Sequence, residues 1–347
     1  MAPRVPAVDP ASLAAWCTDH LGSAPAAELF RCGHLSAVIG LRLADGREVV
    51  VKVRPASPRI AACVEVQRRM FESGYPCPEP LGGPAPCGIG VATAESYVPG
   101  GDELPGAEHT AQLSAEAFAR LIGLAPRAAE VSSLDPAPSW ASWNHGEAGL
   151  WPRPEGAEFD LNEVDGPEWI DRAAGRARDR LRAGVWEAVI GHCDWLADNL
   201  RWKDDELLVV HDWDSAVADS EAVLVGFAAA LYSTVSPDEL ATVEETDRFL
   251  DAYCDARARV FSADEVQRSW AAGVWTRAYD AKYQHVAGHA IASLAETEDA
   301  AGAGERGIPG LSLVQGLEPP HRRALDDARA LREEACCALV VVGIDRF

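Results

Sequence analysis

Apolar and polar positions divide the chain into a first part that favours a sheet and a remainder that favours helices. A helix is expected over residues 9–21, where Asp9 precedes a proline at the first helical position and apolar residues recur at helical spacing. The apolar runs of residues 28–53 are instead interrupted by glycines, and Asp45 with Gly46 forms a hairpin signal between two of them. The pattern predicts an antiparallel sheet in this part of the chain.

Two more elements complete the first part. Residues 59–73 read as a helix that ends before a glycine, and residues 90–98 read as a strand. Proline and glycines follow at 99–101, which is typical of a connector between lobes, so we place a lobe boundary at residue 98. The backbone around Glu95 and Tyr97 could offer amide and carbonyl groups to a planar base.

Helical periodicity dominates after the connector. Helices are expected over 114–124, 167–188, 219–235, 238–260, 264–297 and 319–335. A tryptophan-rich stretch at 134–162 is either local packing or a ligand platform, and packing is the more common role of such clusters. The apolar tail at 336–344 fits a final strand or the end of a helix.

A polar loop between two short apolar runs carries the strongest chemical signal. Asp194 and Asn199 follow the first run, and Asp212 follows the second, so a small hairpin would bring the three side chains to one end. Carboxylate and amide oxygens suit a hard cation that keeps water and phosphate oxygens as its other ligands. A separate carboxylate can accept a proton from an attacking alcohol.

A lysine also stands inside an otherwise apolar strand, in Val-Val-Val-Lys52-Val. An edge-strand lysine that reaches water is the ordinary explanation. However, the following helix carries Glu65 among apolar neighbours, and the two side chains could pair so that the ammonium is directed at a phosphate.

Composition restricts the class of partner. The net charge of −23 argues against nucleic acid or an anionic membrane as partner and is compatible with a cationic substrate, although it also serves solubility. Asp247, Asp251 and Asp255 similarly form either a solvated helix face or the rim of a cation site. Nine cysteines without a CxxC pair and no apolar run of about 20 residues favour a cytoplasmic protein. A monomer and a homodimer are both compatible with the sequence.

The ordered set of motifs from about residue 30 to 235 resembles the aminoglycoside phosphotransferase-like kinases, which include choline kinases and share the protein-kinase-like fold. The motifs are Asp45 to Val53, Glu65 with 74–81, Tyr97 to Gly100, His192-Cys193-Asp194 with Asn199, and Val210 to Asp214. The resemblance implies a two-lobed α+β fold. Residues 1–98 would form a small antiparallel β lobe, and 99–347 a larger, mainly helical lobe with the catalytic loop at 191–214.

The resemblance also implies roles for individual residues. Asp194 would orient or deprotonate the acceptor hydroxyl, and Asn199 with Asp212 would hold magnesium between the ATP phosphates. Lys52 would contact those phosphates and Glu65 would hold it.

Three further residues have roles that depend on local conformation. Ser36, in a turn with only one glycine, could donate to a phosphate. Asp214 would be a second carboxylate near the metal if it shares a strand face with Asp212, whereas a loop at this point would separate the two. His192 would brace the backbone around the catalytic loop.

The reaction implied is transfer of the ATP γ-phosphate, with magnesium, to a hydroxyl of a small molecule. An aminoglycoside or amino sugar is the favoured acceptor, and choline-like amino alcohols, macrolides and homoserine are alternatives. A nucleotide-binding pseudokinase with a regulatory role is an alternative of another class. A protein kinase is disfavoured because no Ala-Pro-Glu segment follows Asp214.

Overall fold

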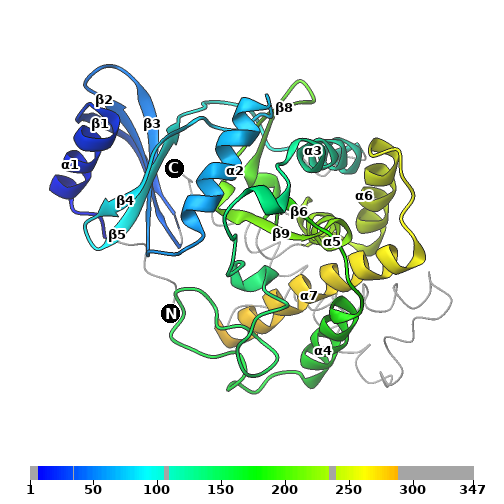
Figure 1. Ribbon diagram of the computed structural model, residues 1–347. Helices are drawn as coiled ribbons and strands as arrows, with labels where there is room; N and C mark the ends of the chain where they lie inside the picture. The colour runs from blue at the N-terminus through cyan, green and yellow to red at the C-terminus, as the bar shows by residue number, and fades with distance from the viewer. Residues whose placement is uncertain (1–6, 34, 105–108, 234–239, 288–347) are drawn as a thin grey trace, which may run out of the picture.

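The computed structural model describes residues 7–33, 35–104, 109–233 and 240–287 and shows two lobes (Figure 1). The first lobe is built on a five-stranded antiparallel sheet, and the second is mainly helical. The predicted two-lobed α+β fold is confirmed. The helix expected over 319–335, the tail at 336–344 and the last part of the helix expected over 264–297 lie outside the described residues.

The sheet of the first lobe has the strand order β1-β2-β3-β5-β4. Its strands are β1 (Pro25–Cys32), β2 (Ala37–Leu43), β3 (Glu48–Arg54), β4 (Pro80–Cys87) and β5 (Gly90–Ser96). The predicted hairpin joins β2 to β3, and Gly46 adopts φ 90°, which favours glycine at this position. Strand β4 was not predicted, because its prolines and glycines are typical of a loop; it lies at the edge of the sheet, where such residues are tolerated.

Two helices flank this sheet. Helix α1 (Pro10–Leu21) begins at Asp9, whose carboxylate accepts the Ser12 N–H at 2.9 Å, and it contacts β4. Helix α2 (Ile60–Glu72) contacts β4 and also a 3₁₀ turn, η4 (Trp213–Ser215), of the second lobe. Helix α2 therefore touches both lobes.

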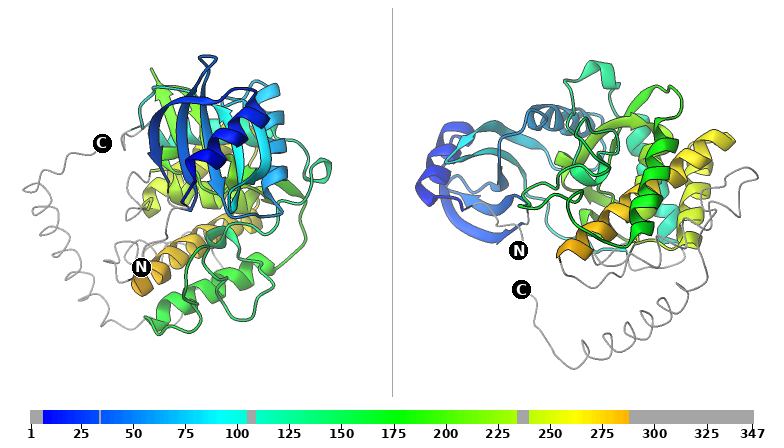
Figure 2. Two further views of the ribbon diagram at one scale, coloured as in Figure 1. Left: turned by 90° about the vertical axis from the view of Figure 1, so that its left-hand side faces the viewer. Right: turned by 90° about the horizontal axis from the view of Figure 1, so that it is seen from below.

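The second lobe is organised around its longest described helix, α7 (Ala263–Ala287), which lies beside α4 (Glu168–Arg182) and α5 (Glu221–Leu231) (Figures 1 and 2). Helices α3 (Thr110–Leu124) and α6 (Val243–Ala256) pack against each other. Two short 3₁₀ turns, η1 (Ala128–Glu130) and η2 (Ser139–Ala141), follow α3.

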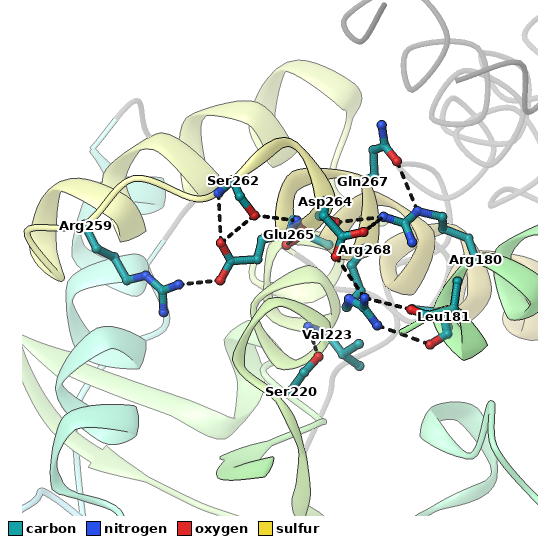
Figure 3. Close-up of polar contacts among 12 residues, drawn as sticks. Arg180, Leu181, Ser220, Val223, Arg259, Ser262, Asp264, Glu265, Gln267 and Arg268 are labelled. Atoms are coloured by element: carbon teal, nitrogen blue, oxygen red, sulfur yellow. Dashed lines mark hydrogen bonds and ion pairs between the residues drawn. The ribbon is translucent and has the colours of Figure 1, made fainter. Parts of the chain in front are cut away.

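The start of α7 is tied to the neighbouring helices by polar contacts (Figure 3). The Ser262 N–H donates to Glu265 at 2.8 Å, and Arg268 donates to the Ala183 carbonyl oxygen after α4 at 2.8 Å. Asp264 accepts from Arg268 and from Arg180 of α4. These contacts fix the direction in which α7 crosses the lobe.

Two small antiparallel sheets carry the polar loop. Strand β6 (Ala188–His192) pairs with β9 (Ala216–Ser220), and β7 (Leu200–Lys203) pairs with β8 (Glu206–Val210). A 3₁₀ turn, η3 (Ala197–Asn199), lies between β6 and β7. Strand β9 was not predicted: the expected helix began at 219, but α5 starts only after Ser220, whose hydroxyl caps it.

Tryptophan side chains of the stretch at 134–162 are buried in the second lobe. The Trp143 indole donates to Asp219 at 2.7 Å, and the Trp151 indole donates to Asp171 at 2.8 Å. The Trp151 and Trp275 rings lie 5.4 Å apart. Packing is thus the main role of these tryptophans.

The chain crosses between the lobes along residues 97–104. Asp102 and Trp202 exchange backbone hydrogen bonds of 2.8 Å in both directions. Gly101 has φ +81°, and a Cβ there would lie 2.8 Å from the Arg201 Cβ, so the connector needs glycine at this close approach. Within the described residues, no helix combines the length and the apolar character needed to span a membrane.

Candidate active site

His192 fixes the start of the polar loop. It ends β6 with no exposed surface, and its Nε2 lies 3.0 Å from the His211 carbonyl oxygen. Its Nδ1 accepts the Asp194 N–H at 3.3 Å, so the hydrogen on the ring is on Nε2. Burial lowers the pKa of His192, which keeps the ring neutral. The predicted bracing contact is present.

Asn199 orients the Asp194 carboxylate. Its amide Nδ2 donates to the Asp194 carbonyl oxygen at 2.9 Å and to the Asp194 Oδ2 at 3.0 Å. In this orientation the amide oxygen of Asn199 is its remaining acceptor. Burial, followed by the charge of Asp212, raises the pKa of Asp194 to about 8, although the bond from Asn199 opposes this. A carboxyl group with such a pKa is suited to accept a proton near neutral pH.

Asp212 meets Lys52 from the other lobe. Asp212 follows β8 with φ 56° and ψ 47°, a left-handed conformation uncommon for a residue with a side chain. The Lys52 ammonium donates to its Oδ1 at 2.7 Å, and the Lys52 charge lowers the pKa of Asp212. Burial alone would lower the pKa of Lys52, but the charges of Asp212 and Glu95 raise it well above its usual value. The ion pair joins residues 160 positions apart.

The prediction that Glu65 holds Lys52 is wrong. Glu65 accepts from Arg69 at 2.7 Å, and its side chain is 42% exposed. The physical reason is the phase of α2, whose buried face presents Val66 and Gln67 instead. The second carboxylate at Lys52 belongs to Glu95 of β5, whose Oε1 lies 3.3 Å from the ammonium.

Asp214 does not share a strand face with Asp212, because the chain turns into η4 directly after Asp212. The Asp214 Oδ2 lies 2.5 Å from a guanidinium nitrogen of Arg54, at the end of β3. Its Oδ1 is buried and has no hydrogen-bond partner within the described residues. In this structure Asp214 is therefore first an ion-pair partner, which the sequence pattern did not indicate.

The side chain of Arg59 holds the same turn by binding backbone carbonyl oxygens. Its guanidinium donates to the carbonyl oxygens of Asp214 at 2.6 Å, of Leu134 at 3.1 Å and of Ala216. Arg59 is 7% exposed and precedes α2. This role of Arg59 was not predicted from the sequence, because its partners are backbone carbonyl oxygens far along the chain, which no residue pattern reveals.

The other two predicted contacts of the nucleotide lie on the first lobe. Ser36 is in the turn from β1 to β2; Cys32, at the end of β1, is close enough to Asp212 and Lys52 for their charges to act on the pKa of its thiol, which burial raises. The turn thus begins beside the Lys52 and Asp212 pair. Tyr97 begins the connector, where its N–H donates to the Glu48 carbonyl oxygen at 3.2 Å.

Comparison with known proteins identifies the family. Residues 28–265 match APH, the phosphotransferase enzyme family. The chain belongs to this family. No curated protein is similar enough in sequence to count as a match.

Solved structures with low identity share the fold of this APH-family chain. One is the aminoglycoside phosphotransferase APH(4)-Ia in a ternary complex with ADP and hygromycin B, with 14% identity, a TM-score of 0.55 and coverage of 86% of this chain and 99% of that one. The amicoumacin kinase hAmiN, in complex with AMP-PNP, Ca²⁺ and Ami, has 12% identity, a TM-score of 0.52 and coverage of 82% and 90%. A choline/ethanolamine kinase family protein from Mesorhizobium loti has 15% identity, a TM-score of 0.51 and coverage of 92% and 98%. Family and fold together make this chain a small-molecule phosphotransferase.

The donor atoms of this APH-family site fit a magnesium ion that is shared with a nucleotide. Within the described ranges, no group of three or more His, Cys, Asp or Glu side chains is placed to bind a metal by itself. Magnesium, however, keeps water and phosphate oxygens in its shell and needs only one or two protein carboxylates. Asp212, with 45% of its side chain exposed, and the amide oxygen of Asn199 provide such donors. The Asp214 Oδ1, which has no hydrogen-bond partner among the described residues, is a third oxygen nearby in the chain.

Arg59→Met should lower both stability and activity of this APH-family chain. The change leaves buried carbonyl oxygens without donors, at a cost of about 1–3 kcal/mol for such a group, and loosens the turn that carries Asp214. Thermal unfolding and steady-state turnover would measure the two effects. Arg127→Met is the matched control: its side chain is 82% exposed and its surface ion pair with Glu130 should contribute less than about 1 kcal/mol. Equal melting temperatures for the two variants would contradict the role of Arg59 in holding the turn.

Proposed function

We propose that this protein uses ATP and magnesium to phosphorylate a hydroxyl group of a small molecule. The observation that carries the proposal is the meeting of Lys52 from the sheet with Asp212, together with the Asn199 contact to Asp194. Phosphoryl transfer needs this combination of a phosphate-binding cation, oxygen donors for a metal and a carboxylate for the attacking alcohol. Structures of related proteins in complex with AMP-PNP and with ADP support ATP as the donor.

In this proposal Asp194 receives the proton of the acceptor hydroxyl. The acceptor oxygen forms a bond to the γ-phosphorus as the bond to the oxygen of the leaving ADP breaks, and the proton passes from Asp194 to solvent. Lys52 holds the phosphates of ATP, and the Ser36 turn covers them. Asp212 and Asn199 would hold magnesium, which when bound neutralises phosphate charge. The connector backbone at Tyr97 would receive the adenine base.

We place the acceptor between α7 and the catalytic loop, next to carboxylates that form no ion pair within the described part of the chain. Asp280 of α7 forms no hydrogen bond or ion pair with the described residues, and burial raises its pKa to about 7. Glu155 lies close enough to Cys193, beside Asp194, and to Tyr279, beside Asp280, for its charge to act on both. A carboxylate on which no protein cation acts, such as Asp280, favours an acceptor that brings amino groups, for example an aminoglycoside or amino sugar.

A coupled ADP-release assay over a panel of acceptors tests the function. The panel contains aminoglycosides, amino sugars, choline-like amino alcohols, macrolides and homoserine, and Asp194→Asn is the control. Acceptor-dependent ADP release that this variant lacks would support the proposal and name the acceptor class. ATP binding without release on any acceptor would favour the regulatory pseudokinase instead.

Asp280→Asn should raise the KM for an amine-bearing acceptor by about tenfold, a loss typical of removing one charged contact, with kcat and the KM for ATP nearly unchanged. In the wild type, the same KM should rise as the pH falls below about 7, because the Asp280 carboxyl becomes protonated. Asp251→Asn, on the exposed face of α6, is the control and should have no effect. If Asp251→Asn raised the KM and Asp280→Asn did not, the acidic face of α6 would be the cation site.

A further inference from the structure

We propose that Glu95 of β5 is the residue that positions Lys52, and that Gln67 of α2 holds Glu95 in place. The proposal deepens the function proposed above and rests on it. The sequence pattern predicts Glu65 of α2 as the carboxylate partner of Lys52, whereas the partner in the structure is in the sheet.

The sheet register brings Lys52 and Glu95 together. Strands β3 and β5 are antiparallel neighbours in which Lys52 lies opposite Thr93, and Val50 lies opposite Glu95. Since residues two apart on a strand share a face, Lys52 and Glu95 are diagonal neighbours on one face of the sheet. The Lys52 ammonium lies 3.3 Å from the Glu95 Oε1, and the two residues are 5% and 7% exposed. A carboxylate this deeply buried requires a partner, and Lys52 is its cation.

Gln67 occupies the other oxygen of Glu95. Its amide Nε2 donates to the Glu95 Oε2 at 2.9 Å and to the Pro78 carbonyl oxygen at 2.9 Å. Gln67 is 5% exposed and lies on the buried face of α2. Helix α2 thus contributes a neutral amide, that of Gln67, and no carboxylate to this cluster. The negative charge beside Lys52 comes from Glu95 of β5.

The two carboxylates at Lys52 have different tasks in this arrangement. Asp212 is the proposed donor to magnesium, whereas Glu95 pairs with Lys52 and has no proposed contact with the metal. Glu95 also lies two residues before Tyr97, on the strand that enters the connector. One strand therefore links the proposed adenine contact to the direction of the phosphate-binding lysine, without a carboxylate from α2.

Glu95→Gln tests the proposal, with Glu65→Gln as the matched control. For Glu95→Gln we expect kcat/KM for ATP and the affinity for AMP-PNP to fall by about 10- to 100-fold, the range typical of residues that orient a ligating side chain. The affinity for adenosine should stay unchanged, because adenosine has no phosphate for Lys52. Glu65→Gln, which removes only an exposed contact to Arg69, should match the wild type in all three measurements. Isothermal titration calorimetry and steady-state kinetics provide the values.

Gln67→Leu is a second variant that keeps every charge. Loss of the amide donor should weaken AMP-PNP binding by about three- to tenfold, the value of one hydrogen bond, again with adenosine unaffected. It carries the test if Glu95→Gln fails to fold.

Three outcomes would overturn the role of Glu95: wild-type AMP-PNP affinity in Glu95→Gln, an equal loss in Glu65→Gln, or an equal loss for adenosine and AMP-PNP. A wild-type protein that binds no AMP-PNP would instead overturn the proposed function. The wild-type titration distinguishes the two failures.

Discussion

Asp194→Asn is expected to lower kcat by about 10²- to 10⁴-fold, the contribution typical of a positioned general base. The amide keeps the shape of the side chain and can still contact Asn199, but it cannot take the proton of the acceptor hydroxyl. The KM for ATP should change little, since Lys52 and Asp212 are intact. Steady-state kinetics with the acceptor found in the panel would measure both constants.

The same variant should be more thermally stable than the wild type at pH 8. Burial and the charge of Asp212 raise the pKa of Asp194 to about 8, far above the value of about 3.9 in an unfolded chain. Between these values the folded protein binds more protons than the unfolded chain, so stability falls as the pH rises through this window. Asparagine carries no charge to bury, so the difference in melting temperature should grow from pH 4 to pH 8.

Activity of the wild type should follow the opposite trend. The carboxylate of Asp194 must be ionised to accept a proton, so kcat/KM for the acceptor should rise with pH towards about 8. Asp198→Asn, an exposed neighbour, is the control and should keep activity close to that of the wild type. A purified, folded Asp194→Asn protein with near wild-type turnover would rule out Asp194 as the proton acceptor.

Local spacing in the sequence was enough to predict part of the site. Asp194 and Asn199 are five residues apart in one loop, and the structure joins them by a hydrogen bond of 3.0 Å. Lys52 was recognisable as a charge inside an apolar strand, and it is 5% exposed. The hairpin at Asp45 and Gly46 was predicted for a similar reason, since two adjacent residues determine the turn.

The sequence did not reveal which side chains on different helices and strands contact each other. Whether Glu65 or Gln67 faces the sheet depends on the rotation of α2 about its axis, and Glu65 had apolar neighbours on both sides. Only the backbone of Glu95 was predicted to take part in the site, but its side chain contacts Lys52 because of the register between β3 and β5. Arg59 binds carbonyl oxygens, which every residue has, so no residue type at a distance could indicate it.

Asp212→Asn is the second large effect that we expect, and its signature differs from that of Asp194→Asn. Turnover should fall by about 10²- to 10³-fold, a loss typical of removing one group that stabilises charge in the transition state. Because Asp212 is a proposed donor to magnesium, the magnesium concentration for half-maximal activity should rise as well, whereas Asp194→Asn should leave it unchanged. Titration of activity against magnesium at saturating ATP would separate the two roles.

The change in thermal stability caused by Asp212→Asn should also be opposite in sign to that caused by Asp194→Asn. Lys52 lowers the pKa of Asp212 below its unfolded value, so the pair stabilises the folded protein above that unfolded value and the contribution is lost as the pH falls through the lowered pKa. Asp212→Asn should therefore melt below the wild type at pH 7, and the difference should shrink as the pH is lowered from about 4 to about 2. Asp214→Asn is the comparison, because it removes a carboxylate two residues away that pairs with Arg54 instead. If Asp214→Asn shifted the magnesium requirement and Asp212→Asn did not, the metal would belong to Asp214, and the donor would be its buried Oδ1, which has no hydrogen-bond partner in the described part of the chain.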